Sequence, residues 1–112
     1  MSELSKMNVE YRVDAIRAAL KHHPSLLKRL LNDNQDGINV NATVEALDCD
    51  EPEDILVRVA WDIWNGSGET EFDKILHQLM PDDYEAVLNS MKKFGKLRER
   101  IYSAYASGSE ND

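Results

Sequence analysis

The sequence has little cysteine, little glycine and no long apolar run. Among 112 residues there is one cysteine, Cys49, so no disulfide can form within the chain, and we expect a reducing compartment, the cytoplasm. No stretch approaches the roughly 20 apolar residues of a membrane span, and residues 1–6 carry no apolar signal-peptide core. The only Gly-rich run, residues 65–68, is not followed by the Lys-Ser/Thr of a phosphate loop.

Positive charge is scarce in the middle of the chain, whose formal net charge is −8. Residues 1–31 carry six Lys/Arg against three Asp/Glu, residues 32–90 carry two against fifteen, and residues 91–106 carry five against one. This layout predicts that basic terminal helices pack across an acidic centre, in the same molecule or in a symmetric partner. The alternative is that the acidic middle faces outward and binds a basic partner.

The stretch from Asp50 to Gly66 predicts a helix at the centre of the domain. Asp50 is a suitable N-cap, Glu53 completes a capping box, and Gly66 stands where a left-handed C-terminal residue belongs. Between them, apolar residues cover every direction except one narrow polar stripe, the pattern of a buried helix. Trp61 and Trp64 lie within it, and we expect them to anchor the core or a dimer interface.

Further helices are predicted on both sides of this segment from apolar residues at helical spacing. We expect His22, His23 and Pro24 to end the first helix, and Ser25 and Thr70 to cap two later ones. The predicted ranges are 8–22, 26–32, 71–80 and 82–106, the last being one kinked helix or two shorter ones, and residues 42–47 are an alternative short helix. Residues 37–41 alternate and could form one short extended segment.

These elements predict an all-α fold of about five helices around the central helix. A chain of this length is suited to one small domain. Residues 1–106 are expected to form this domain, and residues 107–112 a disordered C-terminal tail.

Two carboxylate couples suggest one enzymatic alternative. Glu51 and Asp54, and then Asp82 and Glu85, are each three residues apart on different helices. This spacing resembles the magnesium-binding glutamate pairs of all-α nucleotide pyrophosphohydrolases, and the resemblance implies a Mg²⁺-dependent reaction on a nucleoside triphosphate. Carboxylates in first helical turns are also expected from capping and the helix dipole alone.

The acidic middle suggests a binding alternative. Its carboxylates include Asp48, Asp50, Glu51 and Asp54, and their charge resembles that of DNA-mimic inhibitors and immunity proteins, which occupy basic grooves. The basic set in residues 92–100 could instead contact nucleic acid, but the negative net charge argues against that function.

The sequence most favours a non-catalytic protein-interaction or regulatory module without a cofactor. An apolar stripe with a period near 3.5 runs from Tyr84 through Met91 to Tyr105, and with Trp64 it suggests a homodimer. The predicted interaction residues are therefore Trp64, Tyr84, Met91, Tyr105, Asp48, Asp50, Glu51 and Asp54.

Overall fold

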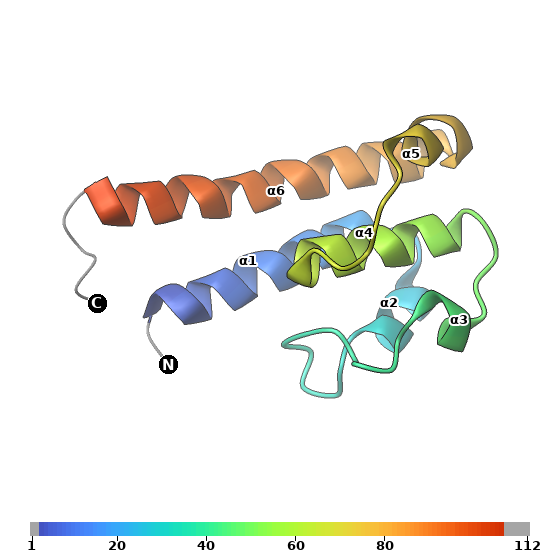
Figure 1. Cartoon of the computed structure of the whole chain (residues 1–112), viewed down its shortest axis with the longest axis horizontal. Helices are drawn as coiled ribbons and strands as arrows, with labels where there is room; N and C mark the ends of the chain where they lie inside the picture. Colours follow the sequence, from blue (N-terminus) through green and yellow to red (C-terminus); the bar gives the residue numbers. More distant parts are fainter. Residues whose placement is uncertain (1–2, 107–112) are drawn as a thin grey trace.

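Helices are the dominant secondary structure in the described part of the chain. A computed structural model describes residues 3–106, with side chains from residue 5 onward, and the predicted tail at 107–112 lies outside this range. The described residues form six helices and no named strand, which confirms the all-α prediction (Figure 1). The helices are α1 (Glu3–Ala19), α2 (Pro24–Leu30), α3 (Val44–Leu47), α4 (Glu53–Asn65), α5 (Phe72–Gln78) and α6 (Pro81–Ala106).

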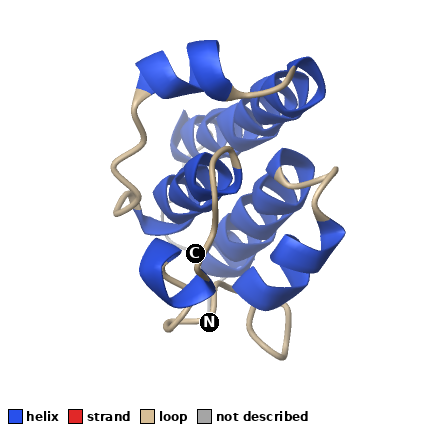
Figure 2. Cartoon of the chain, turned by 90° about the vertical axis from the view of Figure 1, so that its right-hand side faces the viewer, coloured by secondary structure: helices blue, strands red, loops and turns tan. Residues whose placement is uncertain are grey.

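The two longest helices, α1 and α6, lie side by side and antiparallel. Figure 1 shows the first turn of α1 and the last turn of α6 at the same end of the molecule, beyond the end of α4. Helix α4 packs against α1, and α3 contacts α4. In the end-on view of Figure 2 the shorter helices surround these longer ones. Within residues 3–106, no helix is both long and apolar enough to traverse a bilayer.

Helix α4 supplies much of the core, as predicted. Its six buried residues project in several directions around the helix axis, and the partly buried Trp61 and Trp64 pack at the edge of the core. Trp61 Nε1 donates a hydrogen bond to the carbonyl of Ala42 at 2.8 Å. A Cβ added at Gly37 would lie 2.8 Å from the Trp64 ring, so Trp64 lies directly against this loop. The indoles thus hold residues 37–42 onto α4. The buried residues of α4 are Ile55, Leu56, Val57, Val59, Ala60 and Ile63.

Several predicted helix starts are wrong. Prolines determine two of them, and the N–H of Thr70, a predicted cap, is bound by the side chain of Asp62 instead. Helix α4 begins at Glu53, after a turn at residues 51–52, so Asp50 does not cap it. Pro24 and Pro81 open α2 and α6 rather than only ending the preceding helices, since the first helical position needs no N–H donor. Ser25 therefore lies inside α2, and Thr70 precedes α5 by two residues. Gly66 does adopt the expected left-handed conformation, with φ of 77°.

Two open alternatives are settled by the fold. Helix α6 is a single helix from Pro81 to Ala106. The predicted extended segment at residues 37–41 forms only one antiparallel bridge, in which Ile38 pairs with Leu31 of the same chain. The alternation stops at Val40, which is 80% exposed because the chain turns there.

Candidate interaction surface

The two carboxylate couples do not come together. The Glu51 carboxylate lies 3.9 Å from Lys74 Nζ on α5, Asp54 is half-buried on α4, and Asp82 and Glu85 are exposed at the start of α6. Among residues 3–106, no group of three or more His, Cys, Asp or Glu side chains is arranged to hold a metal ion. The described residues therefore offer no support for a magnesium site built from these couples.

The acidic middle contains both exposed carboxylates and carboxylates that hold the fold together, among them Asp62. Asp48 and Asp50 are exposed. The Asp62 carboxylate accepts hydrogen bonds from the backbone N–H groups of Gly68, Glu69 and Thr70 at 2.8, 3.1 and 2.8 Å. Burial alone would raise the pKa of Asp62, but hydrogen bonds from residues 68–70 outweigh burial and leave this pKa below its ordinary value. The Gly-rich segment after α4 is thus tied back onto the helix.

Cys49 is not placed to act as a thiolate. The thiol is half-buried between α3 and α4, and burial raises its pKa, with a further increase from the Glu53 carboxylate. Burial is the larger of these causes. A raised pKa keeps the sulfur protonated and weakly nucleophilic near neutral pH.

His23 has a role that the sequence did not indicate. It precedes α2, and its Nε2 lies 2.8 Å from the Asp83 carboxylate of α6 while its Nδ1 lies 3.4 Å from Glu53 of α4. Asp83 is only 4% exposed, and its second oxygen has no hydrogen-bond partner in the structure. The imidazole therefore joins three segments. Only the tertiary fold reveals this contact, because His23 and Asp83 are 60 residues apart.

Helix α1 packs against α4, but the described basic residues of the terminal helices form no ion pairs with the acidic middle within one molecule. Among the described residues, no Lys or Arg of α1 or α6 forms an ion pair with a carboxylate. Arg12 of α1 instead donates to the carbonyls of Ile63 and Trp64, at 2.7 and 3.1 Å, and its guanidinium lies 5.0 Å from the centre of the Phe94 ring. Helices α1 and α6 associate mainly through apolar contacts, and Arg12 satisfies the C-terminal carbonyls of α4.

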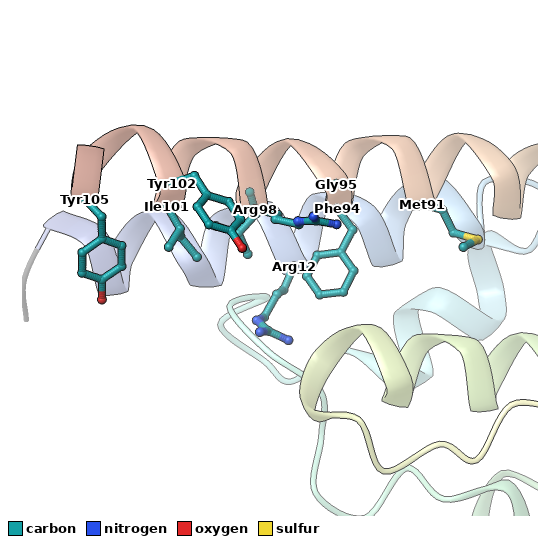
Figure 3. A pocket seen from close by; sticks show the side chains of 9 residues that line it. Arg12, Met91, Phe94, Gly95, Arg98, Ile101, Tyr102 and Tyr105 are labelled. Carbon is teal, nitrogen blue, oxygen red and sulfur yellow. The ribbon is translucent and has the colours of Figure 1, made fainter. Parts of the chain in front are cut away.

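An apolar groove of about 630 Å³ follows the C-terminal half of α6 (Figure 3). Arg12 forms part of its wall opposite α6, where the end of α4 lies nearby. At Met91 and Phe94 it meets a second hollow of about 260 Å³, which reaches Phe72 of α5. The lining residues on α6 are Met91, Phe94, Gly95, Leu97, Arg98, Ile101, Tyr102 and Tyr105.

Two adjacent rows of residues run along α6, each with alternating steps of three and four residues. The inner seam, which faces the molecule, comprises Asp83, Val87, Ser90, Phe94, Leu97 and Ile101, and all of these are buried or half-buried. The outer seam is displaced by one residue and comprises Tyr84, Leu88, Met91, Gly95, Arg98, Tyr102 and Tyr105. The spacing is that of a coiled coil, so α6 presents one occupied and one unoccupied packing face.

The outer seam is open to solvent along most of its length. Leu88 and Met91 are 41% and 49% exposed, and Tyr102 and Tyr105 are 64% and 61% exposed. Tyr84, at its start, is half-buried against the core. The structure therefore places Met91, Tyr105 and Tyr84 in one row, whereas Trp64 lies apart against Gly37. Sequence periodicity located the stripe, but spacing alone did not show which residues of α6 are exposed.

Comparison of the chain with protein-family models, with curated protein sequences and with solved structures finds no match.

Proposed function

We propose that this protein is a non-catalytic protein-interaction module of the cytoplasm, and that it binds its partner through the outer seam and the adjoining groove. The observation that carries this proposal is the row of large apolar side chains left exposed on α6, including Met91, Tyr102 and Tyr105. Aromatic and methionine side chains are enriched in protein interfaces, and Tyr supplies a large contact area at low entropic cost.

The geometry also favours a rigid binding surface. The inner seam fixes α6 against α1, and Arg12 fixes α1 against the end of α4, so the groove is formed before any partner binds. A preformed surface loses less conformational entropy on association. A helix that leaves such a seam open is suited to receive another helix.

Oxidative footprinting with hydroxyl radicals tests this function, and the chain contains a matched control. Met91 and Met80 are 49% and 64% exposed, but only Met91 lies in the outer seam. We expect Met91 and Tyr102 to be protected in concentrated protein or in cell extract, relative to dilute pure protein, while Met80 stays reactive. Equal oxidation of Met91 and Tyr102 under all three conditions would contradict the proposal.

A separate assay tests the absence of catalysis. We expect no release of pyrophosphate when nucleoside triphosphates are supplied with Mg²⁺. Release that is abolished by Glu51→Gln would instead support the hydrolase interpretation and overturn the proposed function.

A further inference from the structure

The outer seam of α6 has features that its own molecule does not explain. Gly95 lies in the middle of a 26-residue helix, where glycine is less stable than alanine. A Cβ at Gly95 would meet no atom within 4 Å, so the fold of the monomer does not require glycine there. Three residues on, at the next position of the outer seam, Arg98 places a large charged side chain in the same row, with its guanidinium 5.7 Å from the centre of the Tyr102 ring. A gap and a projection thus occupy neighbouring positions of one otherwise apolar seam.

We infer that a second copy of this chain occupies the outer seam, with the two α6 helices antiparallel; this inference rests on the proposed function. In coiled coils the seam residues of one helix fill holes on the other. An antiparallel register can place Leu88 opposite the partner's Tyr105 and Met91 opposite the partner's Tyr102. The same register places Gly95 opposite the partner's Arg98, so that the gap accommodates the projection. Twofold symmetry repeats each contact.

In this register the charged residues beside the outer seam of one copy face residues of opposite charge on the other. Lys92 and Glu99 each follow a seam position, Met91 and Arg98, on the same flank of the helix. In the antiparallel register Lys92 comes beside the partner's Glu99, and symmetry forms this pair twice. The other exposed basic residues of this half of α6, Lys93, Lys96 and Arg100, lie on the opposite side of the helix and do not face the partner.

The parallel arrangement is less complementary. It would place Arg98 opposite the partner's Arg98 and Gly95 opposite the partner's Gly95, which brings like charges together and leaves a hole in the interface. The antiparallel arrangement also lets Tyr102 reach the partner's hollow beside Met91, where Phe72 is 71% exposed. Aromatic contact there would cover two of the most exposed apolar side chains.

Cysteine cross-linking tests the register. In a Cys49→Ser background, Leu88→Cys and Tyr105→Cys are prepared as separate proteins and oxidised alone and as a mixture. We expect a covalent dimer only in the mixture. In a dimer of either variant alone, the two identical thiols lie about 25 Å apart along the helix axis, too far to form a disulfide. Linking of either variant alone, or no linking in the mixture, would overturn the register.

Charge exchange tests the pairing by a second measurement. Lys92→Glu and Glu99→Lys should each weaken dimerisation on the order of tenfold, because each replaces two attractive pairs by repulsive ones. The combined Lys92→Glu/Glu99→Lys protein should regain wild-type affinity, and the control Lys96→Glu should leave it unchanged. Failure of the combined variant to recover would overturn the inference.

The outcomes separate this inference from the proposed function. If the wild-type chain is a monomer at all concentrations, yet Met91 and Tyr102 are protected in extract, the second copy is the wrong occupant and the interaction surface stands. If neither dimerisation nor protection is observed, both proposals fail.

Discussion

Replacing Asp62 by alanine should release the segment that connects α4 to α5. The Asp62 carboxylate accepts three backbone hydrogen bonds, from Gly68, Glu69 and Thr70. These bonds hold the connection against α4 and so determine where α5, with Phe72, begins. The Asp62→Ala variant leaves the three N–H groups to water or without a partner.

The size of the effect follows from the number and burial of these bonds. A hydrogen bond to a charged acceptor contributes about 1.5–3 kcal/mol when buried. The bonds from Gly68 and Thr70 are partly buried, and the bond from Glu69 is exposed. We therefore expect Asp62→Ala to lower the free energy of unfolding by about 2–3 kcal/mol in total, which corresponds to a Tm about 8–12 °C lower for a domain of this size.

The stability lost in Asp62→Ala should become smaller as the pH is lowered. The pKa of Asp62 is lowered in the folded state, so its stabilising effect is complete above the unfolded carboxyl pKa of about 3.9 and declines as the pH falls through the lower folded value. The difference in unfolding free energy between wild type and Asp62→Ala should be constant from about pH 5 to 7 and shrink below about pH 4.

Urea denaturation followed by circular dichroism measures this difference. Asp33→Ala, which removes an exposed loop carboxylate, is the control and should change stability by less than about 0.5 kcal/mol. A loss below 1 kcal/mol for Asp62→Ala at neutral pH, or a difference that grows on acidification, would refute the reasoning.

Further substitutions test other parts of the fold, each by urea denaturation. Gly68→Ala should destabilise by more than about 2 kcal/mol, because the added Cβ would lie 1.8 Å from the Arg58 carbonyl oxygen. In dilute monomer, Gly95→Ala should stabilise by up to about 1 kcal/mol, because its Cβ meets open space in a helix; a loss there would contradict the account. His23→Ala should lower the free energy of unfolding by about 2–4 kcal/mol, because the imidazole is the partner of a buried carboxylate. The double variant Asp83→Ala/His23→Ala should lose less stability than the sum of the two single variants, because the two residues interact. Arg12→Ala should lower the free energy of unfolding by about 2 kcal/mol, because two hydrogen bonds to carbonyls are lost. An unchanged urea midpoint would show that the end of α4 does not need the Arg12 side chain.

Local patterns predicted the helical class well because they reflect the same forces that build the fold. Apolar residues around Ile55 and Val59 marked α4 as buried, and Gly66 marked its end. Helix starts were predicted less well. The sequence could not show that Asp62 would take the N–H of Thr70, or that proline would open α2 and α6, because both depend on how segments pack after they form.

The candidate surface could be predicted only in part. Periodicity indicated a stripe from Tyr84 to Tyr105, but only the placement of α1 shows which row of α6 is covered. Phe94 and Ile101 belong to the covered row, and Tyr102 belongs to the open one. Helix α1 does pack against α4, but Arg12 binds backbone carbonyls there rather than carboxylates, a contact that charge counting cannot detect.

Sedimentation equilibrium over a wide concentration range tests the central claim most directly, with wild type beside Met91→Ser/Tyr102→Ser. The account predicts that the wild-type mass rises from monomer to dimer with concentration, while the double variant remains a folded monomer. A wild-type mass that stays monomeric throughout, or a dimer unaffected by the two serines, would contradict the assignment of the outer seam as the contact between copies.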